Sequence, residues 1–128
     1  MVVHSEDGLD EISISALTYV AELKNNHIEE YTISPVDFNI PIQPLASLQA
    51  KDSSESLVLV KKALEGKGVE NPARDIVALN AGAAIYVCGI ADTLKQGVEM
   101  AEDMIGSGLA KVKLSELASF TRYYKNAE

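Results

Sequence analysis

The N-terminal part of the chain alternates in part between apolar and polar residues, with the period of two that is typical of β-strands. Met1-Val2-Val3 is an apolar stretch that we expect to belong to a strand. Residues 17–24 and 27–33 are rich in Tyr, Val, Thr and Ile. Asn25-Asn26 separates these two stretches, and asparagine tolerates the left-handed conformations that two-residue hairpin loops require. The pattern therefore predicts a short strand followed by an antiparallel hairpin.

A two-residue loop would also set the register of the hairpin, in which the facing pairs are Leu23 with Ile28, Val20 with Tyr31, and Glu22 with Glu29. The first two pairs bring apolar or aromatic side chains together. The third pair places two carboxylates opposite each other, which is mildly unfavourable and leaves the loop length open.

The segment after the hairpin is rich in proline. Pro35, Pro41 and Pro44 exclude a long helix or a central strand from residues 34–47. We expect an irregular connection there, followed by a short turn or helix at 45–49.

Apolar residues then recur at helical spacing. Residues 55–65 are preceded by Asp52-Ser53-Ser54, which offer N-caps, and followed by Gly66 and Gly68, which end helices. One face of this helix carries Leu57, Val60 and Leu64.

Asn71-Pro72 opens a second helix with a capping side chain and a proline in the first turn. The helix should run to Cys88 and stop at Gly89. It is apolar nearly all round, so we predict that it is the buried central helix and that Cys88 is an inert core thiol. Asn80 is the exception, and we interpret it as a core amide hydrogen-bonded to a neighbouring loop.

The C-terminal part of the chain predicts two more helices. Asp92 can cap a third helix that extends to Ile105, and Gly106-Ser107-Gly108 then interrupts the chain. A last helix spans about 109–123, and residues 125–128 are expected to fray. The inner stripe of the third helix carries Leu94, Val98, Ala101 and Ile105.

The order of these elements predicts an α/β fold, with a short strand plus an antiparallel hairpin packed with about four helices. The 128 residues suffice for one domain with a moderate core. However, the strands are few for the amount of apolar helix, and the chain opens within a strand. We therefore expect residues 1–128 to be a single partial domain of a larger α/β domain, with an open strand edge and an apolar face.

Composition narrows the possible partners and compartment. The net charge of −8 argues against nucleic acid and anionic membranes as partners. One cysteine excludes an internal disulfide, and no secretory signal is present, so we expect a cytoplasmic protein. The longest uncharged apolar stretch, residues 76–90, is too short and too glycine-rich to span a membrane.

Candidate chemistry lies directly after the first strand, where four carboxylates fall within six positions: Glu6, Asp7, Asp10 and Glu11. Gly8 lies between them and allows a sharp turn. Magnesium takes oxygen ligands, keeps several waters and typically binds one or two carboxylates with a substrate phosphate. The simpler interpretation is a solvated acidic loop, or carboxylates that cap the next element. Because acidic loops are common, the residues alone favour this simpler interpretation over a metal site.

The acidic loop also carries a resemblance to a known family. Val2-Val3-His4 and Asp7-Gly8-Leu9-Asp10-Glu11-Ile12-Ser13 together resemble the metal-site segment of anthranilate phosphoribosyltransferase. The blocks that match further along, in order and at plausible spacing, are Val20-Ala21-Glu22-Leu23, Glu30-Tyr31-Thr32-Ile33-Ser34-Pro35, Asp37-Phe38, Arg74-Asp75-Ile76-Val77, Leu79-Asn80-Ala81, and Ala91-Asp92 with Leu94, Gly97 and Val98. Together they cover most of the chain.

The resemblance implies a transferase of tryptophan biosynthesis that joins anthranilate to phosphoribosyl pyrophosphate. Its products are N-(5-phosphoribosyl)anthranilate and pyrophosphate, and it uses Mg2+. The adjacent acidic pair that holds Mg2+ in the family falls on Asp10 and Glu11, whereas Glu6 and Asp7 have no such counterpart. No catalytic residue and no other cofactor-binding residue is implied within this chain. A nucleoside phosphorylase/phosphoribosyltransferase type of fold and a homodimer are implied for the complete enzyme.

The chain departs from the family pattern in places. Ser5-Glu6 stands where glycine usually follows the histidine, and Ser15-Ala16-Leu17-Thr18 stands where Thr-Gly-Pro-Thr is usual. The N-terminal helical region, the Gly-rich phosphate loop and the basic anthranilate-binding residues of complete members have no counterpart. The chain thus resembles the C-terminal part of the catalytic domain, and we expect it to be inactive alone and either to self-associate or to be marginally stable. Two alternatives stay open: a related-fold pyrimidine nucleoside phosphorylase or transferase paralogue, and a non-catalytic interaction module.

Overall fold

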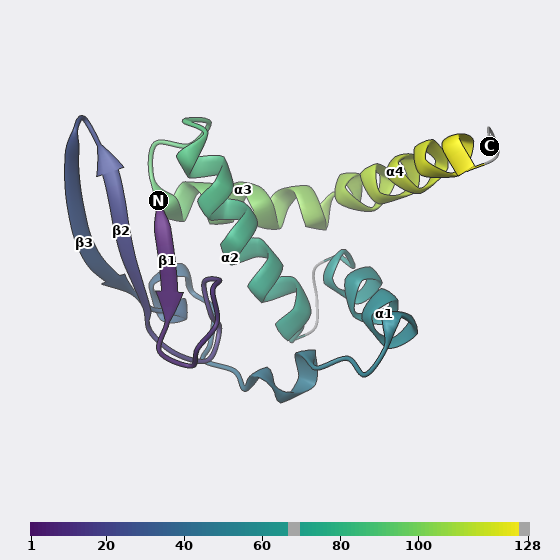
Figure 1. The fold of residues 1–128 in the computed structure, drawn as a ribbon, viewed down its shortest axis with the longest axis horizontal. Coiled ribbons are helices and arrows are strands. Elements are labelled where there is room, and N and C mark those ends of the chain that lie inside the picture. The colour runs from purple at the N-terminus through teal and green to yellow at the C-terminus, as the bar shows by residue number, and fades with distance from the viewer. Residues whose placement is uncertain (67–69, 126–128) are drawn as a thin grey trace.

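A computed structural model describes residues 1–66 and 70–125 of the chain. Within these residues the elements are β1 (Val2–Ser5), β2 (Thr18–Lys24), β3 (His27–Ile33), the 3-10 turns η1 (Pro35–Phe38) and η2 (Leu45–Leu48), and the helices α1 (Ser53–Ala63), α2 (Pro72–Val87), α3 (Leu94–Gly106) and α4 (Leu109–Lys125). Figure 1 shows the small sheet at one end, α2 and α3 crossing beside it, and α4 extending away from the body. The predicted fold class is confirmed. Gly68 and the tail 126–128 lie outside the described residues.

The sheet is antiparallel, with strand order β1-β2-β3, and the hairpin has the predicted register. Asn25 and Asn26 form its two-residue loop, with φ angles of 52° and 61°. Left-handed conformations at both positions match the right-handed twist of the strands. The loop length that the sequence left open is therefore two residues.

The unfavourable carboxylate pair of the hairpin is relieved by two tyrosines. Glu22 does lie opposite Glu29. However, the Glu22 carboxylate accepts hydrogen bonds from the hydroxyls of Tyr31 and Tyr86, both at 2.8 Å. Burial acts to raise the pKa of Glu22, but the bonds from Tyr86 and Tyr31 outweigh it and lower the pKa. Because Tyr86 lies on α2, the same contact ties the hairpin to that helix.

Helix α1 begins two residues earlier than its predicted start at Glu55 and is capped by Asp52, which accepts from the backbone N–H groups of Ser54 and Glu55. Leu57 and Val60, which share one face of this helix, are 49% and 42% exposed. Among the residues of α1 itself only Ala63 is buried. Most of the apolar side of α1 is therefore left open by the described part of the chain.

Helix α2 has the predicted limits. Asn71 caps it by accepting from the N–H of Arg74, and Gly89 follows it with a φ of 72°. Leu79, 1% exposed, belongs to the main hydrophobic core between the sheet and the helices. The helix is not buried all round, however, and Cys88 at its C-cap is exposed. The prediction of a core thiol is wrong because the helix leaves the core in its last turn.

Helices α2 and α3 meet backbone to backbone. A Cβ atom at Gly82 would lie 2.5 Å from the N and Cα atoms of Val98, and one at Gly97 would lie 2.2 Å from the carbonyl oxygen of Gly82. Real Cβ atoms do not approach other atoms so closely, so both positions require glycine. The crossing buries Val98, which is 1% exposed.

Helix α3 begins at a different cap from the one predicted. Its N-cap is Thr93, whose hydroxyl accepts from the N–H of Gln96 at 3.1 Å. Asp92 lies one residue too early to cap, and its own N–H donates to the Gln96 side chain. Much of the predicted inner stripe is buried, namely Val98, Ala101 and Ile105.

Helix α4 is exposed over most of its length and carries a row of large apolar side chains. Leu117 and Phe120 are 58% and 60% exposed, and the centroid of the Phe120 ring lies 5.0 Å from that of Tyr124, another exposed aromatic side chain. None of the helices in the described residues is both long and apolar enough to cross a membrane.

The glycine crossing predicts a large loss of stability on adding a methyl group. We expect Gly82→Ala and Gly97→Ala each to lower the free energy of unfolding by about 2 kcal/mol or more, although alanine favours helices. Gly66→Ala is the control, because its Cβ would lie at an ordinary 3.5 Å from the nearest atom. Urea unfolding measures the difference, and equal stability of all three variants would show that the helices do not touch at these glycines.

The exposed face of α4 predicts self-association of the chain in solution. We expect Leu117→Glu/Phe120→Glu to lower the average mass measured by light scattering. Arg122→Glu is the control, because it changes the net charge by the same amount without removing apolar surface. A parent chain that is a clean monomer and melts cooperatively at high temperature would contradict the prediction.

Candidate functional site

The acidic loop connects β1 to β2 and begins with a tight turn. Gly8 has a φ of 91°, and its N–H donates to the carbonyl of Ser5 at 3.0 Å. The N–H of Ser5 donates in turn to the carbonyl of Leu9 at 3.0 Å. The turn therefore fixes the backbone on the N-terminal side of Asp10-Glu11.

Asp7 supports the loop from inside. Its carboxylate accepts hydrogen bonds from the hydroxyls of Ser13 and Ser15 and from the N–H of Leu9. Burial acts to raise the pKa of Asp7, but these hydrogen bonds outweigh it and lower the pKa from 3.8 to about 2. Asp7 is thus already engaged within the loop, which explains physically why it is not part of the predicted metal pair.

Asp10 and Glu11 differ from Asp7 in having no partners. Both are exposed, and within residues 1–66 and 70–125 neither carboxylate has a hydrogen bond or an ion pair. Glu6, in contrast, accepts from the hydroxyl of Tyr19 at 3.0 Å. Of the four carboxylates in the loop, Asp10 and Glu11 are therefore the two that are free to take an external ligand.

The donor set of this pair fits a hard cation that keeps part of its water. The described residues contain no group of three or more His, Cys, Asp or Glu side chains that would form a complete protein cage for a metal ion. Two adjacent exposed carboxylates supply only a few oxygen ligands. Mg2+ is commonly bound in this way, with waters and substrate phosphates completing its coordination.

The segment that follows the acidic pair is buried and hydrogen-bonded to α2. Ile12 and Ile14 are 3% and 0% exposed. The Asn80 side chain accepts from the N–H of Ile12 and donates to its carbonyl, both at 2.9 Å. It also donates to the carbonyl of Ile76, one turn earlier in α2, at 2.9 Å. The predicted hydrogen bonds between the Asn80 amide and a neighbouring loop are confirmed, although Asn80 is half-buried and does not lie fully in the core.

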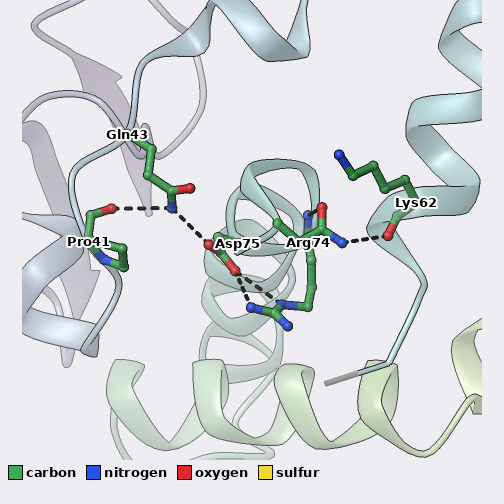
Figure 2. Close-up of polar contacts among 6 residues, drawn as sticks. Pro41, Gln43, Lys62, Arg74 and Asp75 are labelled. Carbon is green, nitrogen blue, oxygen red and sulfur yellow. Dashed lines mark hydrogen bonds and ion pairs between the residues drawn. The ribbon is translucent and has the colours of Figure 1, made fainter. Parts of the chain in front are cut away.

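A second link to α2 runs through Gln43, and sequence analysis missed it. The N–H of Gln43 donates to the carbonyl of Ile14 at 2.9 Å, and its side chain donates to Asp75 at 2.8 Å. Figure 2 shows Asp75 between Gln43 and Arg74, whose guanidinium is 2.9 Å from the carboxylate. Asp75 is 5% exposed and Arg74 is half-buried, so this ion pair is partly shielded from solvent. Residues 32 positions apart form the link, and no local pattern could have indicated it.

The contacts of Asp7 predict how the loop responds to acid. The pKa of Asp7 is lower in the folded chain than its ordinary value. Its contribution to stability is therefore present above pH 3.8 and lost as the pH falls towards 2. We expect the parent to lose more stability than Asp7→Asn over this range in thermal melts. Ser15→Ala should reduce the effect and Ser119→Ala, which changes a hydroxyl on α4, should not; a parent and Asp7→Asn with parallel pH profiles would contradict the prediction.

Comparisons with known proteins agree with the resemblance seen in the sequence. The chain is 72% identical over 128 residues to the anthranilate phosphoribosyltransferase of Marinomonas sp. (strain MWYL1), covering all of this chain and 37% of that protein. It is 53% identical over 127 residues to that of Stutzerimonas stutzeri (strain A1501), covering 98% of this chain and 36% of that protein. The chain thus spans little more than a third of the curated relatives it matches.

Solved structures give the same result for the fold. The crystal structure of anthranilate phosphoribosyltransferase from Thermus thermophilus matches with a TM-score of 0.81 and 32% identity, over 94% of this chain and 35% of that one. The Saccharomyces cerevisiae enzyme in complex with PRPP and Mg matches in fold, with a TM-score of 0.74 and 23% identity, over 88% of this chain and 32% of that one.

The family model of the glycosyl transferase family, a/b domain, matches residues 1–111, which include the sheet, the acidic loop and the helices α1 to α3. The resemblance to anthranilate phosphoribosyltransferase and the predicted fold are confirmed by these matches. The chain belongs to the glycosyl transferase family, whose a/b domain model matches residues 1–111.

Proposed function

We propose that residues 1–128 are a single partial domain, the C-terminal part of the α/β catalytic domain of an anthranilate phosphoribosyltransferase. The complete enzyme would transfer phosphoribosyl from phosphoribosyl pyrophosphate to anthranilate in tryptophan biosynthesis, in the cytoplasm and as a homodimer. The observation that carries the proposal is the 72% identity to the Marinomonas enzyme over the whole of this chain. No comparable observation favours a nucleoside phosphorylase or an interaction module.

Asp10 and Glu11 are proposed to hold Mg2+ in that enzyme. Their exposure and their lack of partners among the described residues support the assignment, as does the related yeast structure, which contains PRPP and Mg. When bound, the ion would neutralise negative charge that develops on the departing pyrophosphate. The chain carries a net charge of −8, so its own field would repel a pyrophosphate, and a cation site is the contribution expected from this part of the enzyme.

The residues of this chain have a limited role in the proposed reaction. The amine of anthranilate attacks C1 of the ribose while the C1–O bond to pyrophosphate breaks, and the amine then loses a proton. We assign no general base within the described residues. Asp10 and Glu11 would hold the ion, which would supply positive charge next to the leaving pyrophosphate, and the Gly-rich phosphate loop that the resemblance implies would belong to another part of the complete enzyme.

A chimera tests the proposal in a complete enzyme. This chain would replace the equivalent 128 residues of the Marinomonas enzyme, to which it aligns over its full length. We expect an active transferase in which Asp10→Asn or Glu11→Gln lowers kcat/KM by about 10²-fold, or about 3 kcal/mol of transition-state stabilisation. The chain by itself should show no transferase activity.

The control is Glu6→Gln, which alters a carboxylate of the same loop that already has the Tyr19 partner. It should change kcat/KM much less, and all three variants should melt like the parent. Steady-state kinetics over a magnesium series would measure the effect. Near-parental kcat/KM of Asp10→Asn and Glu11→Gln at low magnesium would overturn the metal assignment, and an inactive but folded chimera would overturn the proposed function.

A further inference from the structure

The acidic pair occupies a two-residue span between two fixed points of the backbone. On one side Leu9 is held through both of its main-chain groups. The Leu9 carbonyl accepts from the N–H of Ser5 at 3.0 Å, and the Leu9 N–H donates to the Asp7 carboxylate at 3.3 Å. On the other side Ile12 is held by Asn80 through both of its main-chain groups. The side chains of Asp10 and Glu11 add no restraint of their own in the described residues. Their placement therefore depends on these two points.

The two fixed points differ in origin. Leu9 is held by Ser5, the last residue of β1, and by Asp7 of the loop itself, both within five positions of it. Ile12 is held by a residue 68 positions away, on the central helix. The bond pair to Ile12 is thus the contact that fixes the acidic pair relative to α2. The Asn80 amide is also oriented by its third bond, to the carbonyl of Ile76 within α2.

We propose that Asn80 is a positioning residue for the metal pair, an inference that rests on the proposed function of Asp10 and Glu11. By holding the peptide groups of Ile12, the Asn80 amide restricts the backbone of the preceding residue and keeps the two carboxylates in a geometry that can share one cation. Without it, the ordering of the loop has to occur when the metal binds, and this costs conformational entropy. Groups that orient metal ligands commonly change metal affinity by 10- to 100-fold when they are removed.

The alternative role for Asn80 is structural support alone, and the chain offers a matched control for it. Asn71 is the N-cap of the same helix, and its amide makes two bonds, accepting from the N–H of Arg74 at 3.2 Å and donating to the carbonyl of Lys62 at 2.7 Å. Its partners lie at the N-terminus of α2 and at the end of α1. Asn71→Ala should therefore destabilise the fold by loss of a helix cap without releasing the acidic loop.

The experiment measures Mn2+ binding to the complete chain at low ionic strength by electron paramagnetic resonance, which reports the concentration of free aqueous ion. Mn2+ alone is the probe, because it shares the preference of Mg2+ for oxygen ligands. The binding due to the acidic pair is the difference between the parent and Asp10→Asn/Glu11→Gln. This difference remains measurable if the chain self-associates.

We expect Asn80→Ala to weaken this binding by about tenfold or more, and to speed amide exchange at Ile12. Asn80→Ser is a milder second variant, because its hydroxyl can still bond to the carbonyl of Ile76 within the helix but is too short to replace both bonds to Ile12. It should preserve the fold and weaken binding to a similar degree. Asn71→Ala should lower Tm and leave the Mn2+ affinity unchanged.

Two results would overturn the inference, and they are distinguishable. If both Asn80 variants lower Tm yet bind Mn2+ like Asn71→Ala, Asn80 supports the fold only, and the metal assignment of Asp10 and Glu11 stands. If the parent and Asp10→Asn/Glu11→Gln bind Mn2+ equally, the metal assignment fails and the positioning role fails with it.

Discussion

The direct contact between α2 and α3 is the constraint on which the rest of the structure depends. At Gly82 and Gly97 the two helices approach so closely that neither position leaves room for a Cβ atom. Close backbone contact allows Val98 and Ala101 of α3 to be fully buried against α2. It also fixes the orientation of α2, so that its remaining faces point to the sheet, to the acidic loop and to α1. A central helix held in one orientation can position segments that are distant in sequence.

Polar side chains of α2 then tie the surrounding segments to this helix. Asp75 binds Gln43 in the proline-rich connection, Asn80 binds Ile12 in the acidic loop, and Tyr86 binds Glu22 in the hairpin. Among the described residues no buried side-chain nitrogen or oxygen lacks a hydrogen-bond partner. Buried polar groups are costly when unpaired, so these contacts both satisfy the core and specify one arrangement of the loop.

Two carboxylates of the acidic loop have opposite roles, although they differ by only three positions. Asp7 is surrounded by donors, which lower its pKa and use it as part of the loop. Asp10 projects into solvent without partners in the described residues. The burial of Ile12 and Ile14 under α2 separates these roles, because it turns the loop so that Asp7 faces Ser13 and Ser15 while the following acidic pair faces outward.

The sequence by itself determined the features that depend on neighbouring residues. Asn71-Pro72 and Gly89 bounded α2 through the chemistry of helix ends. Asn25-Asn26 indicated a two-residue hairpin loop because asparagine adopts left-handed conformations, but the facing pair Glu22 and Glu29 left the loop length open until the structure showed the register. Only the tertiary structure decided which surfaces are covered and which distant groups meet. The apolar side of α1 and Cys88 remain exposed because helical periodicity states which residues share a face but not whether another element covers it. The links from Gln43 to Asp75 and from Asn80 to Ile12 join residues 32 and 68 positions apart, and packing of the helices, rather than local pattern, brings them together.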